Sequence, residues 1–337
     1  MRFALTAEQQ DLRTVVRDLM ERLCAPAVVR CAPTSPEVDA LDRGLVEVGA
    51  AGLLLPEHHG GLGLDENYLV PMLTEVGWAA APLPVLETVA VAPALFEAAG
   101  LADRITSAGM VCVADPMGAG TARYGTRARF LIRGGFGGTG PVELLDISAA
   151  AREPVSAVDP AADMCRVGAG AVLLGVVDDP AVVARAWQRG VLGAAAMLVG
   201  LARRMLEMTV EYVRTRTQFG VPVGSFQAVK HHLATALLQV EFAAPAVARA
   251  GYALAADEPE RDRDVSMAKA LASDAARAVA RTAIQCHGAI GYTTEYDLHL
   301  YAKRAWALAA EWGSAAWHRA RVAEHLGLSR TGTPPPH

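Results

Sequence analysis

Apolar side chains recur at helical spacing over both ends of the chain, and the part between them has shorter apolar runs. In the C-terminal part, apolar positions three or four residues apart form stripes that predict amphipathic helices. Two of these stripes are Leu233, Leu237, Val240 and Ala244, followed by Met267, Leu271, Ala275 and Val279. Asp264 or Ser266 is expected to cap the second helix. The periodicity continues from Asp179 to about Gly327, which predicts a four-helix bundle.

The first 108 residues also have a helical pattern. Thr6 and Gln9 have the spacing of a capping box, in which each side chain accepts a hydrogen bond from the other's backbone. A Pro- and Gly-rich turn at residues 56–63 separates two further helical segments. An N-terminal helical domain is therefore expected.

From about residue 109 to 179 the apolar runs are short and typical of strands. The runs "MVCV", "RFLIR", "VELLDI" and "AVLLGVV" are separated by Gly, Pro and Asp. The expected fold class is α+β, mainly α. Its parts are an N-terminal helical domain (1–108), a reduced middle β domain (109–179), a C-terminal helical bundle (180–330) and a disordered tail (331–337).

Composition and charge exclude several classes of function. The 337-residue chain is 52% hydrophobic and 20% charged, which excludes disorder over most of its length. A formal net charge of −5 gives no attraction to nucleic acid or to an anionic membrane. Without a signal-peptide pattern or an uncharged apolar run of about 18 residues, a cytoplasmic protein is expected.

The five cysteines lack CxxC spacing, so neither disulfides nor a zinc site is expected.

Two motifs suggest cofactor or metal chemistry but have simpler interpretations. The GxGxxG match at residues 135–140 is followed by Pro141 and a β-prone run, whereas a dinucleotide fingerprint needs a helix there. A glycine-rich turn is expected instead. His231 and His232 have no third ligand at helical spacing, so we expect a solvated pair. No metal site is predicted.

Two segments beside glycine-containing turns carry groups suited to an anion or a ring. Residues 214–234 place Arg216 before a Gly/Pro turn, with the aromatic Phe219 close by. Residues 284–304 place the amide of Gln285 near Gly288, where the backbone allows close approach. Taken separately, each segment could equally be a structural corner.

Together these segments give the chain a resemblance to the acyl-CoA dehydrogenases, flavoenzymes that form an α,β-double bond in acyl thioesters. The stretches "TAEQQDLRTVVRDL" and "GLLLPEHHGGLGL" extend the likeness to nearly the whole chain. The resemblance implies FAD as cofactor and a fold of helical, β-barrel-like and four-helix domains. It also implies residues that reach across a subunit interface to hold the adenosine diphosphate end of a neighbour's FAD. These are Arg216, Gln218, Phe219, Gln285, Gly288 and Ala289, the last replacing a usual glycine.

The part of the family pattern that performs the reaction is missing. The usual position of the glutamate base falls on Trp312, and Glu311 would be turned away by about 100° if both lay on one helix. A second family position for this glutamate falls near Gly190, beside Gln188 and Arg189, without a carboxylate. Usual flavin contacts are also replaced, by Ala114, Asp115, Ser314 and Ala316. No catalytic residue is therefore expected.

These losses resemble a subclass from actinobacterial steroid side-chain catabolism that forms α2β2 heterotetramers. There, one subunit carries the base and the flavin ring, and the other completes the adenosine end of the site. The resemblance implies a non-catalytic subunit whose homologous partner binds the acyl-CoA substrate. Two alternatives stay open: a self-sufficient enzyme with Glu311 as base, and a flavin-free helical scaffold subunit.

Overall fold

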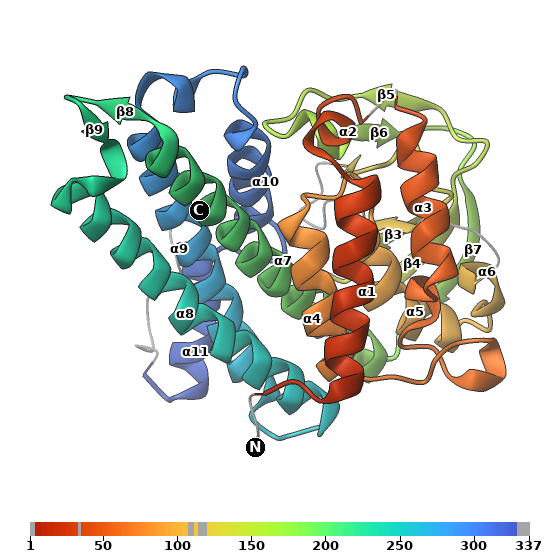
Figure 1. Ribbon diagram of the computed structural model, residues 1–337. Coiled ribbons are helices and arrows are strands. Elements are labelled where there is room, and N and C mark those ends of the chain that lie inside the picture. Colours follow the sequence, from red (N-terminus) through yellow and green to blue (C-terminus); the bar gives the residue numbers. More distant parts are fainter. Residues whose placement is uncertain (1–3, 33–34, 107–110, 114–119, 329–337) are drawn as a thin grey trace.

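The computed structural model describes residues 4–32, 35–106, 111–113 and 120–328. The expected tail at residues 331–337 lies outside these ranges, as do Ala114 and Asp115. Along the chain, helices come first and last, and the strands of two small sheets lie between them in sequence. Figure 1 shows these sheets on the same side of the bundle as the N-terminal helices. The expected class, mainly helical α+β, is confirmed. None of the described helices combines the length and apolarity needed to span a bilayer.

The N-terminal part is built from short helices. They are α1 (Ala7–Leu23), α2 (Pro26–Arg30), α3 (Glu37–Glu47), η1 (Ala50–Gly52), η2 (Glu57–His59), α4 (Glu66–Trp78), the π-helix η3 (Glu87–Val91), α5 (Ala92–Ala98) and α6 (Asp103–Thr106). The predicted capping box is confirmed at α1. The Gln9 backbone amide donates to the Thr6 hydroxyl at 3.2 Å, and the Thr6 amide donates to the Gln9 side chain at 3.0 Å.

All four predicted β runs form strands, and they belong to one sheet in the order β1-β3-β4-β7. The strands are β1 (Val111–Val113), β3 (Phe130–Gly134), β4 (Val142–Asp146) and β7 (Val172–Val177). Because β3 and β4 pair antiparallel, the glycine motif between them is a turn, as expected. A second sheet was not foreseen from the sequence. It contains β2 (Thr121–Ala122), β6 (Cys165–Val167) and β5 (Arg152–Pro154), which are too short to show alternation.

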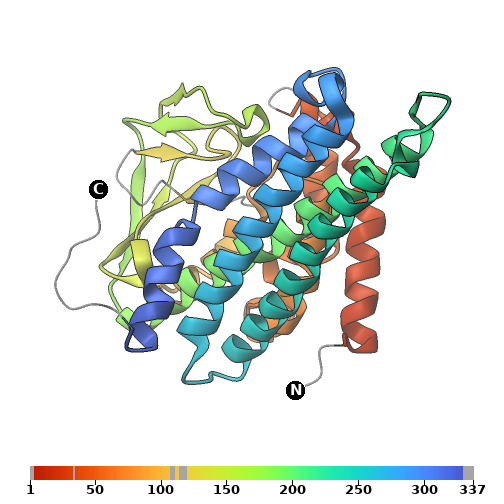
Figure 2. The same ribbon diagram turned by 90° about the vertical axis from the view of Figure 1, so that its left-hand side faces the viewer.

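The C-terminal part is a bundle around the 36-residue helix α7. Its elements are α7 (Pro180–Thr215), the hairpin β8 (Thr217–Gln218) and β9 (Val221–Pro222), η6 (Val223–Ser225), α8 (Gln227–Ala255), α9 (Arg261–His287), η7 (Gly288–Tyr292), α10 (Leu298–Ala310) and α11 (Ala315–His325). Figure 2 shows the long helices side by side, with the hairpin projecting at one end.

Two expectations about helix ends in this bundle are wrong. Helix α9 begins at Arg261, ahead of the expected caps Asp264 and Ser266, so both lie inside the helix and are buried. The helical periodicity expected to reach Gly327 is interrupted between α10 and α11, where residues 311–314 form a turn. Trp312 and Gly313 take positive φ angles of 55° and 88° there, which a helix does not allow.

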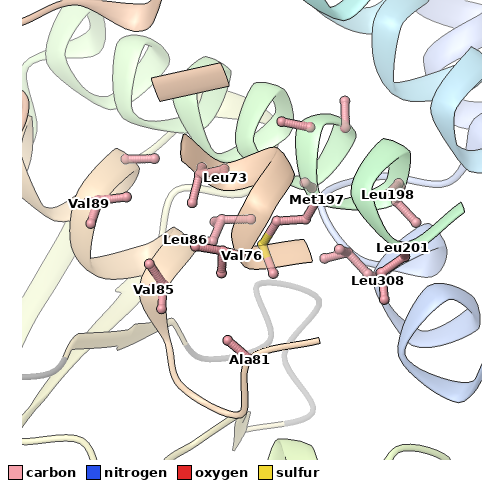
Figure 3. Packing of buried hydrophobic residues seen from close by; sticks show 14 of the residues in the cluster. Leu73, Val76, Ala81, Val85, Leu86, Val89, Met197, Leu198, Leu201 and Leu308 are labelled. Atoms are coloured by element: carbon pink, nitrogen blue, oxygen red, sulfur yellow. The ribbon is translucent and has the colours of Figure 1, made fainter. Parts of the chain in front are cut away.

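Helices α4 and α7 approach so closely that glycine is required on both. A Cβ on Gly77 of α4 would lie 2.2 Å from the Met197 carbonyl oxygen, and one on Gly200 of α7 would lie 2.0 Å from the Thr74 carbonyl oxygen. Around this crossing, side chains from α4, η3, α7 and α10 fill the main core (Figure 3). The crossing joins the N-terminal helices to the bundle.

The apolar stripes on α8 and α9 are only partly buried. On α8, Val240 is 1% exposed but Leu237 is 46% exposed, and Phe242 beside them is 70% exposed. The buried face of α8 instead carries small residues, among them Ala236 and Ala243. These small side chains let α8 lie close to α9, while Leu237 and Phe242 lie on the exposed surface of α8.

Candidate functional site

Trp312 lies in the turn between α10 and α11 and is 8% exposed. Its indole packs against Trp187 of α7, with ring centroids 5.2 Å apart. Trp187 also contacts Phe136 at 5.0 Å and Trp317 of α11 at 6.0 Å. Trp312 is therefore part of an aromatic cluster (Phe136, Trp187, Trp312 and Trp317) that joins the β part to the bundle.

Gly190 of α7 lies directly against the Trp312 indole. A Cβ built on Gly190 would be 2.3 Å from Cζ3 of Trp312, too close for any side chain. The positions of Gly190 and Trp312, both expected from the resemblance to lack the family's glutamate, thus face each other, and the indole leaves no room for a side chain on Gly190. The neighbours of Gly190 bind elsewhere: Gln188 donates to Asp262, and Arg189 donates to Glu66 at 2.8 Å.

Little space remains beside the indole among the described residues. A cavity of about 20 Å³ is lined by Trp187 and Trp312 together with apolar side chains such as Val91, Leu95 and Val183. Such a volume holds about one water molecule. This cavity is far too small for an acyl chain.

Hydrogen bonds hold the Trp312 turn in place. His318 Nε2 lies 2.8 Å from the Trp312 carbonyl oxygen, and its Nδ1 lies 3.2 Å from the Ser266 hydroxyl. Burial lowers the pKa of His318 to about 4, so the ring is neutral and donates to the carbonyl through Nε2. Lys269 is fully buried and donates to the carbonyls of Gly313 at 3.0 Å and Ala309 at 3.3 Å. The indole is therefore presented by a fixed backbone.

Glu311 caps the C-terminus of α10 and is turned toward the β part. Its carboxylate is paired with the guanidinium of Arg123, a buried side chain. Glu311 and Trp312 do not share a helix, because α10 ends at Ala310 and both lie in the turn that follows. The two side chains nevertheless have different surroundings: one meets Arg123, the other Trp187 and Gly190.

A buried group of charges extends from Glu311 into the N-terminal part. Arg123 also lies 3.8 Å from Asp159, which pairs with the buried Arg304, and Arg304 donates to the Ala81 carbonyl at 2.8 Å. Glu87, at the start of the π-helix, is 6% exposed. Burial raises its pKa to about 7, Arg123 opposes this rise, and Glu311 adds to it. These groups tie the three parts of the chain together.

The residues expected to hold a dinucleotide lie at the other end of α7. Arg216 follows the last turn of α7, and Gln218 and Phe219 belong to the β8–β9 hairpin. All three are exposed, and Phe219 is 93% exposed with a positive φ of 52°. An aromatic side chain at so strained and exposed a position is unusual for a surface without a partner.

The second segment lies at the same end of the bundle. Gln285 is in the last turn of α9, and Gly288 and Ala289 follow it; all three are exposed. Tyr212 of α7 stacks on His287, with ring centroids 4.4 Å apart, and so joins the ends of the two helices. The structure therefore brings the two sequence segments together.

The two regions are far apart in the molecule. Gly190 and Arg216 are 26 positions apart along α7, which corresponds to about 40 Å at about 1.5 Å per residue. The aromatic cluster with Trp312 and the exposed end with Arg216 are consequently separate sites. His231 and His232 are exposed near the start of α8, as a solvated pair would be.

Comparison with known proteins identifies the family. The acyl-CoA dehydrogenase N-terminal domain matches residues 6–104, and the acyl-CoA dehydrogenase C-terminal domain matches residues 181–327. Acyl-CoA dehydrogenase IpdE2 of Mycobacterium tuberculosis is 34% identical over 307 residues, covering 88% of this chain and 91% of that protein. The chain belongs to the acyl-CoA dehydrogenase family. IpdE2 of Mycolicibacterium smegmatis is 33% identical, covering 89% of this chain and 93% of that protein.

Solved structures show the same fold. The ChsE4-ChsE5 complex from Mycobacterium tuberculosis matches with a TM-score of 0.82 and 24% identity, over 98% of this chain and 100% of that chain. A variant of the Tcur3481-Tcur3483 steroid ACAD matches with a TM-score of 0.80 and 24% identity, over 95% and 98% of the two chains. The expected acyl-CoA dehydrogenase-like fold is confirmed.

Within this family fold, sequence reasoning missed Glu87, Arg123 and the partners of Trp312. The one available signal was the isolated carboxylate of Glu87 inside the apolar stretch "PVLETVAVAPALF". Arg123 lies between short strands and gives no periodic signal. Ser314, which the resemblance places at a replaced flavin contact, has a local role: its hydroxyl accepts a hydrogen bond from the Trp317 amide at 3.2 Å and caps α11.

The contact between Gly190 and Trp312 can be tested by a double-mutant cycle. Gly190→Ala should destabilise the chain by about 1–3 kcal/mol, because the new methyl group overpacks the indole. In a Trp312→Ala background the same change should be neutral or stabilising by up to about 1 kcal/mol, since alanine favours the helix. Urea unfolding of all four proteins measures this. An equal loss in both backgrounds would contradict the contact.

The buried state of Glu87 predicts a pH dependence. With its folded pKa near 7 and an ordinary value of 4.5, this carboxyl binds its proton more tightly in the folded chain. Its contribution therefore makes the protein less stable as pH rises from about 4.5 to 7. Between pH 5 and 8, wild type should lose about 2–3 kcal/mol more unfolding free energy than Glu87→Gln. The exposed Glu47→Gln serves as control; identical pH profiles of Glu87→Gln and wild type would refute the assignment.

Proposed function

We propose that this chain is the non-catalytic subunit of an FAD-dependent acyl-CoA dehydrogenase. A homologous partner carries the catalytic glutamate and the acyl-CoA, and this chain supplies contacts to the adenosine diphosphate end of the partner's FAD. The observation that carries the proposal is the packing of Trp312 on Gly190, which leaves both positions of the family base without a carboxylate. The arginine and glutamine segments at the far end of α7 are retained.

The reaction of the family needs a base at the substrate and a flavin ring beside it. The base removes a proton while a hydride passes to the flavin, and the protein contributes geometry and proton transfer. We place the indole of Trp312 where the base would lie, and the cavity that the described residues leave beside it is about 20 Å³. The carboxylate next in sequence, Glu311, is held by Arg123. This arrangement supports a chain that is not competent alone.

The exposed end of the bundle fits the charged and planar parts of a dinucleotide. The Arg216 guanidinium is suited to a pyrophosphate, and the Gln285 amide can both donate and accept. Gly288 has a φ of 66°, and no atom lies within 4 Å of a Cβ placed on it, so a ligand could approach its backbone closely. The exposed ring of Phe219 offers a stacking surface. When bound, FAD supplies the hydride acceptor of the reaction.

The distance between the two regions supports sharing of the cofactor between chains. One FAD is much shorter than the roughly 40 Å along α7 that separates Gly190 from Arg216. A cofactor held by Arg216 therefore places its ring outside this chain's own aromatic cluster. We therefore place that ring in the partner subunit.

The partner is proposed to be a homologous acyl-CoA dehydrogenase subunit in an α2β2 complex. The exposed apolar side chains of α8, Leu237, Leu238 and Phe242, support a large subunit interface. Two structural neighbours are described as a ChsE4-ChsE5 complex and as a Tcur3481-Tcur3483 steroid ACAD.

By analogy with these neighbours we propose a steroid side-chain acyl thioester as substrate. We also propose a cytoplasmic location. The same proposal divides the chain into domains at residues 1–108, 109–179 and 180–330.

Purification separates this proposal from its alternatives. The chain produced alone should be colourless and inactive, and co-expression with a homologue bearing glutamate at the Trp312 position should yield a yellow, active complex. A yellow chain that oxidises acyl thioesters alone would support Glu311 as base. A complex whose partner binds FAD equally well without this chain would support a flavin-free scaffold.

Arg216 provides the sharpest test of the cofactor contact. In the co-expressed complex, Arg216→Ala should weaken FAD binding about ten- to hundredfold, because a charged hydrogen bond to pyrophosphate contributes about 1.5–3 kcal/mol. FAD titration of the complex after cofactor removal measures the affinity. Arg214→Ala, an exposed arginine two residues earlier, should leave it unchanged. Equal affinities in both variants would contradict the role of Arg216.

A further inference from the structure

A cluster of metal-ligand side chains lies among the N-terminal helices, on the side of the molecule opposite the β8–β9 hairpin (Figure 1). His58 and His59 come from η2, and Glu97 comes from α5. One ligand atom from each lies within 4.8 Å of the others. The two imidazole rings are 4.2 Å apart between centroids. Two elements far apart in sequence thus place two nitrogens and one carboxylate oxygen around a common point.

The loop that carries the histidines has a fixed backbone. The Gly61 amide donates to the Pro56 carbonyl at 3.2 Å, and the Gly63 amide donates to the Leu55 carbonyl at 2.8 Å. A Cβ on Gly61 would lie only 2.1 Å from the Leu55 carbonyl oxygen, so the loop is closed tightly on itself. Because the backbone is already ordered, binding a ligand here has a low entropic cost.

A fourth group has the position of an outer-shell partner. The carboxylate of Asp103, at the start of α6, lies 3.5 Å from Nδ1 of His59. A carboxylate this close to Nδ1 can accept a hydrogen bond from it when Nε2 binds a metal, an arrangement typical of metal-binding histidines. His58 and Glu97 are exposed and His59 is half-buried, so an ion can reach the cluster from solvent.

We propose that His58, His59 and Glu97 bind a divalent cation of the zinc class, with Asp103 orienting His59. Two imidazoles and one carboxylate are a ligand set that Zn²⁺ uses with water in its fourth position, whereas Mg²⁺ and Ca²⁺ prefer oxygen. The bound ion links the η2 loop to α5. The sequence expectation of no metal site was based on cysteine spacing and on His231 and His232. It overlooked Glu97, which is distant from the histidines in sequence.

The site can be tested with Zn²⁺ and the untagged, metal-free full-length chain. Isothermal titration with ZnCl₂ should show one site per chain. His59→Ala and Glu97→Gln should each weaken it at least about tenfold, and Asp103→Asn about tenfold or more. His231→Ala, which changes an exposed histidine on α8, should bind like wild type. Circular dichroism establishes that each variant is folded.

Replacing Zn²⁺ by Co²⁺ gives a second readout, because the visible absorption of bound Co²⁺ depends directly on its nitrogen and oxygen ligands. The absorption should appear with wild type and the His231→Ala variant and be lost in the His59→Ala variant. Absence of saturable Zn²⁺ binding by wild type would overturn the site. So would unchanged affinity in both the His59→Ala and Glu97→Gln variants. Neither result bears on FAD binding at Arg216, so this inference and the proposed function fail independently.

Discussion

The close approach of α7 to its neighbours is the constraint on which the rest of the structure depends. At Gly200 the helix meets the backbone of α4, and at Gly190 it meets the Trp312 indole; at neither position is there room for a Cβ. Gly77 of α4 is required from the opposite side for the same reason. These contacts fix one long helix against the N-terminal helices and against the turn that follows α10.

The two ends of α7 differ in how completely the neighbouring helices cover them. Lys269 and His318 hold the Trp312 turn from α9 and α11, so the indole lies on α7 as part of the core. At the opposite end, Tyr212 and His287 join α7 to α9 and leave Arg216 and the hairpin exposed. The core is thus completed around Trp312, and polar groups remain exposed at the opposite end of α7. This contrast is what the proposed division of roles between two subunits explains.

Short sequence patterns correctly predicted those features of the fold that are determined by neighbouring residues. The Thr6 capping box, the four strands of the larger sheet and the glycine turn after β3 depend on residues close together in the chain. The break after α10 was missed because the apolar pattern continues through it, and only the positive φ of Trp312 and Gly313 shows the turn. The stripe through Leu237 predicted an amphipathic helix but not the exposure of Leu237, because periodicity identifies an apolar face without telling what covers it.

The features of the candidate sites that could not be predicted from the sequence depend on contacts between residues distant in the chain. The pairing of Glu311 with Arg123, the burial of Glu87 and the approach of Glu97 to His58 each join residues distant in the chain. By contrast, the segments around Arg216 and Gln285 could be recognised, because each is a continuous motif beside a turn. Their meeting at one end of the bundle required the structure, which shows Tyr212 stacked on His287.

The most direct test of the central claim is an electron-density map of the co-purified complex with its homologous partner. Density for the adenosine diphosphate part of FAD should lie against Arg216 and Gln285 of this chain, with the flavin ring in the partner and only the indole of Trp312 against Gly190. A flavin ring stacked in this chain's own cleft, with the Glu311 carboxylate released from Arg123 and facing a thioester, would contradict the account.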